Sequence, residues 1–190
     1  MGSQFEYFIK RLVLFFIFAF VTYNVFIFIG GEYLSKRFKP NIIYENGHNY
    51  LRLDEVKTTK NVDILFLGSS HTYRGFDTRI FKEAGYKVFN MGSSSQTPAQ
   101  TLVLLKRYLN QLSPKLVVFE VFPNIFTIDG VESTLDLISN DNNDLHSLKM
   151  VIEQKNMKVL NTYLYALQKE IIGFIPSYKF NTYHQGGYVS

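Results

Sequence analysis

The chain has 190 residues, a formal net charge of +4, no cysteine, and an aromatic share of 16% carried by Phe and Tyr. This length accommodates one domain and an accessory segment, and the 46% hydrophobic share excludes a disordered chain. The lack of cysteine excludes disulfides, thiolate metal sites and cysteine nucleophiles, and the scattered Lys and Arg residues argue against a nucleic-acid partner.

The first feature along the chain is an uncharged apolar run at residues 12–29. A helix of that length spans roughly 27 Å, close to the hydrocarbon thickness of a bilayer. The two alternatives are a buried core helix and a cleaved signal peptide. The run lacks the polar stripe of the first and the small-residue cleavage site of the second. Residues 1–31 therefore predict a single-pass membrane anchor, with the lipid bilayer as a partner.

The orientation of this anchor is only weakly encoded, because basic residues flank the apolar run on both sides. The segment before the run is short, so we expect the amino terminus inside and the following domain in the extracytoplasmic space. Residues 32–60 are polar and mixed, which is typical of a juxtamembrane connector that carries at most a short helix.

Residues 61–190 form the predicted α/β domain, because strand and helix patterns alternate there. Asp77 is expected to cap a helix that stops at Gly85, and Pro98 is expected in the first turn of the next helix. Such alternation predicts parallel strands with right-handed crossovers. The expected elements are strands at 62–67, 87–91 and 115–122, and helices at 77–84 and 97–112.

The remainder from Val131 onward is helical in pattern, with apolar residues at helical spacing that predict core-facing stripes. The polar segment 140–144 is expected to be a solvated loop that caps a helix near Asp144. The expected stripe residues are Leu145, Leu148, Val151, Ile152, Leu160, Leu164, Leu167 and Ile171, and Leu102, Leu105, Leu109 and Leu112 lie along one side of the helix at 97–112.

The segment Gly68-Ser69-Ser70-His71 directly follows the first strand. Small residues at that place make a turn and an N-cap whatever the function. They also place a serine hydroxyl at the carboxyl end of a strand, where open α/β sheets bind ligands. A serine there is a candidate nucleophile if a base and an oxyanion site are supplied.

A second Gly/Ser corner follows the second strand, in Asn90-Met91-Gly92-Ser93. Neighbouring parallel strands bring both corners to one edge of the sheet. We therefore expect the Gly92 N–H to face the Ser70 hydroxyl, because an amide without a side chain allows close approach of an oxyanion.

These two blocks resemble the SGNH (GDSL-like) hydrolases, over roughly residues 63–124. The resemblance is greatest to the membrane-anchored subset that modifies cell-envelope polymers, such as the D-alanyl transfer proteins of teichoic acid and the alginate O-acetyltransferases. It implies a three-layer, flavodoxin-like parallel sheet of five strands in the order 2-1-3-4-5. It further implies Ser70 as nucleophile, Ser70, Gly92 and Asn124 around the oxyanion, and Ser69, His71, Asn90 and Ser93 along the pocket.

The chain departs from this family in two respects. Asn124 stands after Pro123 rather than in a Gly-x-Asn turn, so it is equally a plain turn residue. The Asp-x-x-His block that supplies the base is absent, and only three of five strands are found, so we expect an incomplete, C-terminally truncated relative. His71 is expected to line the pocket, and His48, His146 and His184 to be exposed or turn residues.

The sequence therefore supports two main hypotheses. The first is a membrane-anchored esterase or O-acyltransferase that acts on a cell-envelope glycan or polymer, together with an acyl-donor membrane protein and without a cofactor or metal. The alternative is a non-catalytic, membrane-tethered binding or accessory module. A cytoplasmic flavodoxin-like ligand binder is a third possibility if the apolar run does not span the membrane.

Overall fold

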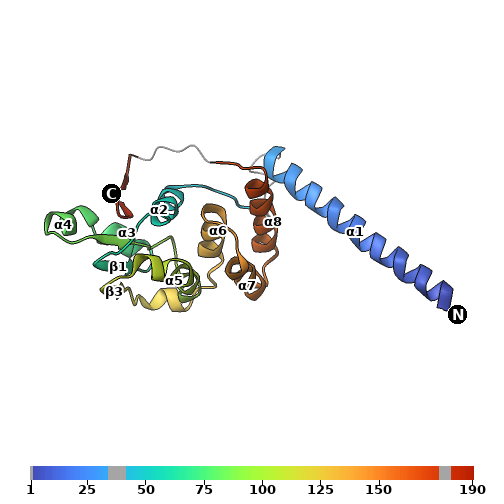
Figure 1. Ribbon diagram of the computed structural model, residues 1–190, viewed down its shortest axis with the longest axis horizontal. Coiled ribbons are helices and arrows are strands. Elements are labelled where there is room, and N and C mark those ends of the chain that lie inside the picture. Colours follow the sequence, from blue (N-terminus) through green and yellow to red (C-terminus); the bar gives the residue numbers. More distant parts are fainter. Residues whose placement is uncertain (1, 34–41, 176–180) are drawn as a thin grey trace.

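The computed structural model describes residues 2–33, 42–175 and 181–190. Eight α-helices, one 3₁₀ helix and five short strands lie in these ranges, and Figure 1 shows their arrangement. In chain order they are α1 (Gly2–Tyr33), α2 (His48–Val56), β1 (Ile64–Leu67), α3 (Ser70–Gly75), α4 (Thr78–Glu83), β2 (Val88–Asn90), α5 (Pro98–Leu112), β3 (Leu116–Phe119), η2 (Pro123–Phe126), α6 (Val131–Asn140), α7 (Leu145–Gln154), α8 (Met157–Ile171), β4 (Tyr183–His184) and β5 (Tyr188–Val189).

The domain is mixed α/β, built on a parallel three-stranded sheet in the order β2-β1-β3. In this sheet Leu65 of β1 pairs with Phe89 of β2 on one side and with Val117 of β3 on the other. The predicted parallel alternation of strands and helices is therefore confirmed at this level. Asp77 caps α4 by accepting the Arg79 amide, as predicted.

The central strand β1 is buried on both faces. Leu65 and Leu67 belong to the main core, which also holds Leu104 and Leu112 of α5. Phe66 points to the opposite face, where its ring stacks on Phe76 at 4.5 Å. By contrast, β3 at the sheet edge leaves apolar side chains exposed, among them Leu116 at 54%, although parallel sheets are usually covered on both faces.

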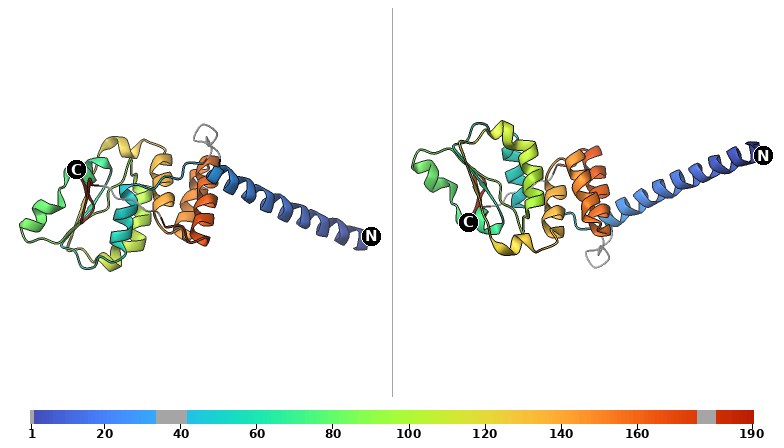
Figure 2. Two further views of the ribbon diagram at one scale, coloured as in Figure 1. Left: turned by 90° about the horizontal axis from the view of Figure 1, so that it is seen from above. Right: turned by 90° about the horizontal axis from the view of Figure 1, so that it is seen from below.

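Helix α1 projects from the domain and ends far from the sheet in each of the three views (Figures 1 and 2). An 18-residue window within its segment Gln4–Tyr33 has a mean hydropathy of 2.6, so one helix among the described residues is long and apolar enough to cross a membrane. Its last turns pack against α8, with Ile27 and Gly31 buried.

Helix α2, in the second half of the predicted connector, packs into the core of the domain. Leu53 and Val56 are fully buried, and so is the guanidinium-bearing side chain of Arg52. Arg52 Nε and Nη2 both donate to the carbonyl of Gly187, at 3.1 and 3.0 Å. The C-terminal hairpin β4–β5 is thereby tied to the domain, and the Gly186 carbonyl also accepts the amide of Asn90.

The predicted apolar stripes were wrong for several residues. Leu145 and Ile152 on α7 and Ile171 at the end of α8 are 80%, 63% and 84% exposed, and Leu102 on α5 is 52% exposed. These helices instead bury neighbouring faces that mix polar and apolar residues, because their tertiary partners, rather than hydrophobicity alone, select the contact face. The buried residues of α7 and α8 are Ser147, Met150, Val151, Val159, Asn161, Thr162, Tyr163, Tyr165, Ala166 and Lys169.

The segment 140–144 was also misjudged as a solvated loop. Asp141 is buried, and it accepts hydrogen bonds from Arg107 Nη1 at 2.8 Å and from the Tyr108 hydroxyl at 2.6 Å. Asp144 does cap α7, through the amides of His146 and Ser147. Asp141 is therefore an internal partner of Arg107, and the exposed Asp144 accepts from the same guanidinium, neither of which the local sequence reveals.

Candidate functional site

The two Gly/Ser corners lie side by side at the carboxyl ends of β1 and β2. The Ser93 amide donates to the Gly68 carbonyl at 3.2 Å, and the Met91 amide donates to the Phe66 carbonyl at 2.8 Å. A Cβ atom at Gly92 would lie only 2.9 Å from the Ser69 carbonyl oxygen. The corners are thus in direct backbone contact.

Ser69 is the N-cap of α3, and its side chain accepts the His71 amide. The Ser69 hydroxyl also lies 2.9 Å from each carboxylate oxygen of Glu120, and the Ser69 amide donates to Glu120 Oε2 at 2.6 Å. The capping function expected of a small residue after a strand is therefore present at Ser69. Because Ser69 is buried and bonded in this way, it is a structural serine.

Glu120 is the residue of this site that the sequence reading missed. It follows β3 directly and accepts hydrogen bonds from Ser69, His71 Nδ1 at 3.0 Å and Thr72 Oγ1 at 2.8 Å. Burial alone would raise the pKa of Glu120, but the bonds from Thr72, Ser69 and His71 outweigh it and hold that pKa below its usual value. The sequence did offer one sign of this role, because Glu120 is the single carboxylate in the otherwise mostly apolar segment 115–122.

Gly68 allows this carboxylate to approach. A Cβ atom at position 68 would lie 2.5 Å from Glu120 Oε2 and would also collide with the Thr72 hydroxyl. The close packing of the turn against the end of β3 therefore requires glycine there.

The Glu120 carboxylate also sets the tautomer of His71. An ionised carboxylate only accepts hydrogen bonds, so Nδ1 of His71 donates to Glu120, and in the neutral imidazole this leaves the lone pair on Nε2. The side chain is 64% exposed, and its ring packs edge-on against Phe122 at 4.8 Å. The result is an imidazole held in one orientation with its basic nitrogen available.

Ser70 is the first residue of α3 and is partly exposed. Neither its hydroxyl nor its amide makes a hydrogen bond to another residue in the part of the chain that the structure describes. Tyr73, three residues on, shares its helix face and reaches the second corner, where its hydroxyl lies 3.4 Å from Ser94 Oγ. Ser70 therefore directly precedes His71 in α3, and its hydroxyl is unengaged among the described residues.

Asn90 and Gly92 form the floor of the second corner. The buried Asn90 side chain donates to the Thr72 carbonyl at 2.8 Å and accepts the Gly92 amide at 3.1 Å. The Gly92 N–H is therefore already bonded, and it could hold an oxyanion only by exchanging this partner. The Ser70 amide has no such competitor among the described residues.

The other two predicted site residues lie outside this cluster of bonds. Ser93 is buried, and its hydroxyl donates to Gln96 Oε1 at 2.9 Å, which is a contact within its own loop. Asn124 is exposed within η2, where its carbonyl accepts the amide of Thr127 at 3.1 Å. Both arrangements fit loop and turn residues.

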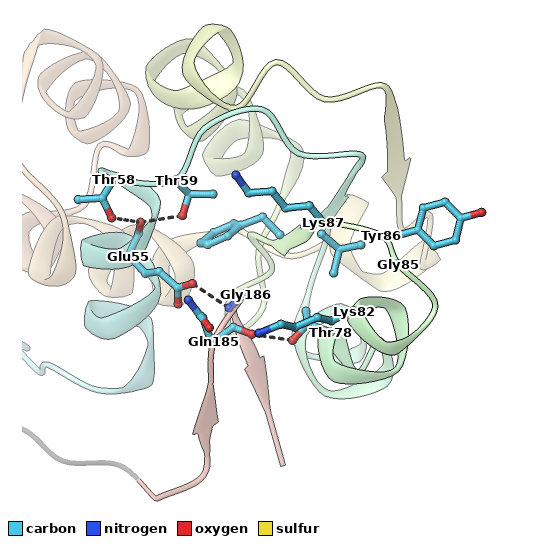
Figure 3. Close-up of a pocket in the computed structure, with 12 residues that line it drawn as sticks. Glu55, Thr58, Thr59, Thr78, Lys82, Gly85, Tyr86, Lys87, Gln185 and Gly186 are labelled. Carbon is cyan, nitrogen blue, oxygen red and sulfur yellow. Dashed lines mark hydrogen bonds between the residues drawn. The ribbon is translucent and has the colours of Figure 1, made fainter.

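Cavities occur in two places among the described residues, one beside the sheet and one beside α6. One of about 550 Å³ lies beside β2, α4 and the C-terminal hairpin (Figure 3). Its polar groups are largely bonded to each other, with Thr78 donating to the Gln185 carbonyl and Glu55 accepting the Gly186 amide. None of the predicted site residues lines this cavity, so it is part of the packing of the hairpin.

The second cavity, of about 500 Å³, opens beside Ser94. Its wall is acidic and includes Asp129, Glu132 and Asp136, with Lys158 as the basic residue. Burial raises the pKa of Asp136 to about 7, against the opposing charge of Arg52. No group of three or more potential ligand side chains that could hold a metal ion occurs among the described residues.

Comparison of the chain with family models, curated proteins and solved structures gives no match.

Proposed function

We propose that this protein is a membrane-anchored esterase or O-acyltransferase of the SGNH type, with Ser70 as its nucleophile. The observation that carries the proposal is the pairing of His71 Nδ1 with Glu120 Oε1 at 3.0 Å, on the residue that directly follows Ser70 in the chain. A base held by a carboxylate next to a serine is the arrangement that serine acyl transfer uses. In this proposal the pair supplies the base that the Asp-x-x-His block provides in the family.

In the proposed reaction, the Ser70 hydroxyl oxygen attacks the carbonyl carbon of an ester while His71 Nε2 takes its proton. The Ser70 amide stabilises the oxyanion of the tetrahedral intermediate. Collapse breaks the ester bond, and His71 returns the proton to the departing alcohol. A water or polymer hydroxyl then attacks the acyl-serine through the same steps, which regenerates Ser70 and gives a free acid or a new ester.

The strand order β2-β1-β3 supports the flavodoxin-like part of this proposal, because it corresponds to the first three strands of the order 2-1-3-4-5. The apolar helix α1 supports a single-pass anchor. We further propose that the domain is extracytoplasmic and acts on a cell-envelope glycan or polymer, with an acyl-donor membrane protein as partner.

A non-catalytic, membrane-tethered binding module is the second candidate. It is favoured by the Gly92 amide, which is bonded to Asn90 Oδ1 instead of standing free for an oxyanion. In this case Glu120 and Ser69 would serve only to fasten α3 to β3.

Hydrolysis of p-nitrophenyl acetate by the detergent-solubilised full chain separates the two candidates. The esterase proposal predicts turnover that Ser70→Ala abolishes. Ser95→Ala is the matched control, because its hydroxyl lies in the second corner but bonds the exposed Glu132 at 2.8 Å. Turnover that survives Ser70→Ala would rule out Ser70 as nucleophile, and a folded wild-type chain without turnover would favour the binding module.

A further inference from the structure

The last turns of α1 do not project freely but are built into the domain. The Tyr23 hydroxyl donates to Asn161 Oδ1 at 2.5 Å near the start of α8, and Lys169 Nζ pairs with Glu32 at 2.7 Å near its end. Gln168 adds a bond to the Asn24 carbonyl at 3.0 Å. These polar contacts fix the direction of α1 relative to α8.

The same contacts limit how much of α1 is available to the hydrocarbon core. The Arg11 guanidinium reaches back over the Tyr7 ring, 4.2 Å from its centroid, so its charge lies about one turn towards the amino terminus. From the level of Tyr7 to Tyr23, a helix rises about 24 Å, whereas the hydrocarbon core is about 30 Å thick. Because the available span is about 6 Å shorter than the core, the domain beside Tyr23 is drawn down onto the bilayer boundary, and the bilayer there thins to match.

The end of the domain that meets this boundary is the α7–α8 turn. Asn24 contacts Gln168 and Glu32 contacts Lys169, both near the end of α8, whereas Tyr23 contacts Asn161, so the two helices cross. The Tyr23 contact is the nearest of these to the start of α8, which therefore lies on the side where α1 enters the bilayer. In Figures 1 and 2, α8 stands next to the base of α1, while α4 lies at the opposite end of the domain.

The surface of this turn has the composition of an interfacial segment. Ile152 and Met157 are 63% and 61% exposed on either side of it, although both are large apolar residues. Lys155 is exposed between them, and the Lys149 side chain is 69% exposed one turn earlier on α7, where it lies 3.8 Å from the exposed Glu153 carboxylate. Apolar side chains together with basic residues are what the boundary of an anionic membrane binds.

We propose that the α7–α8 turn, residues 152–157, is a second membrane contact that lies in the headgroup layer of a bilayer containing anionic lipid. Ile152 and Met157 insert at the acyl boundary, and Lys149 and Lys155 face lipid phosphates. This proposal rests on the membrane anchor of the proposed function but not on its chemistry. Two contacts, α1 and the turn, hold the domain at one height and one orientation over the membrane surface.

The absence of cysteine in the chain makes a direct test simple. Ile152→Cys and Met157→Cys variants of the full chain would be labelled with an environment-sensitive fluorophore and reconstituted in vesicles of phosphatidylcholine and phosphatidylglycerol. Ile80→Cys is the matched control, because Ile80 on α4 is also 63% exposed. Lipids carrying a nitroxide near the headgroup serve as the quencher.

The proposal predicts strong quenching and a blue-shifted emission at positions 152 and 157, with neither effect at position 80. Vesicle-bound protein that shows no quenching at 152 and 157, or equal quenching at all three positions, would overturn the second contact and leave the anchor intact. Protein that does not float with the vesicles would overturn the anchor and the second contact together. None of these outcomes depends on the esterase activity, which is read separately from Ser70.

Discussion

The Glu120 carboxylate links the fold to the proposed chemistry, and Glu120→Gln perturbs both with little change in shape. The Ser69 amide and the Thr72 hydroxyl both donate to Oε2, at 2.6 and 2.8 Å. A glutamine carbonyl can keep these two bonds while its NH₂ group replaces Oε1. That NH₂ group then faces His71 Nδ1, which the carboxylate contacts at 3.0 Å.

The expected loss of stability follows from the change in these bonds. A hydrogen bond to a charged group contributes about 1.5–3 kcal/mol, whereas a neutral one contributes about 1 kcal/mol. Because the bonds of one carboxylate are not additive, we expect Glu120→Gln to lower the free energy of unfolding by about 2–3 kcal/mol. Glu132→Gln is the control, because Glu132 is exposed and accepts a single side-chain bond from Ser95.

The functional effect arises from the tautomer of His71. An NH₂ group donates, so Nδ1 must become the acceptor and the proton moves to Nε2, which removes the proposed base. Glutamine at 120 should therefore abolish esterase turnover more completely than the stability loss explains. In the type case of a serine triad, the equivalent carboxylate-to-amide change leaves the geometry intact and lowers kcat about 10⁴-fold.

Two measurements check this reasoning on the detergent-solubilised chain. Thermal unfolding, followed by near-ultraviolet circular dichroism of the tyrosines, gives the stability of each variant. Nitrogen NMR at alkaline pH, where imidazoles are neutral, distinguishes the two tautomers of His71. A Glu120→Gln variant as stable as Glu132→Gln, or one that keeps the proton on Nδ1, would refute the role assigned to the carboxylate.

Three further predictions concern acid–base behaviour and backbone geometry. The folded pKa of Asp136 is raised to about 7, above its unfolded value, so stability is expected to fall by about 2–4 kcal/mol as pH rises from about 4 to 7. A flat melting profile over that range, matching Asp136→Asn, would contradict this. The pKa of Glu120 is lowered, so its contribution to the free energy of unfolding is present at neutral pH and is lost as pH falls below about 4.5 through the folded value. Acid titration of stability should show this loss in the wild type and not in Glu120→Gln. Gly187→Ala would push a methyl group into the Asn90 carbonyl at a φ of +92° and should lower the melting temperature. Gly47→Ala is the control and should not lower it, because Gly47 has open space around it. Equal melting temperatures of the two variants would show that the hairpin is not held as described.

The sequence predicted well those features that depend on neighbouring residues. The cap at Asp77, the alternation of strands and helices and the apolar span near the amino terminus are set by contacts within a few residues. Ser69 illustrates the limit of such rules. Its capping role was visible locally, whereas its partner Glu120 lies 51 positions away, just after β3.

The parts that sequence reasoning missed all depend on tertiary partners. Asp141 looked solvated until Arg107 and Tyr108 of α5 were placed beside it. The apolar residues Leu145 and Ile152 fit a core stripe by spacing, yet α8 and α6 contact a different face of α7. Periodicity shows that a helix has an apolar face, but the neighbours decide which face is buried.

The central claim is that Ser70, and not its structural neighbour Ser69, reacts as a nucleophile beside the His71–Glu120 pair. Labelling of the full chain with a fluorophosphonate, followed by tandem mass spectrometry of the peptide that contains residues 69 and 70, tests it most directly. The account predicts a single adduct on the Ser70 oxygen that is lost in Glu120→Gln. An adduct on Ser69, or a folded chain that takes up no label at all, would contradict it.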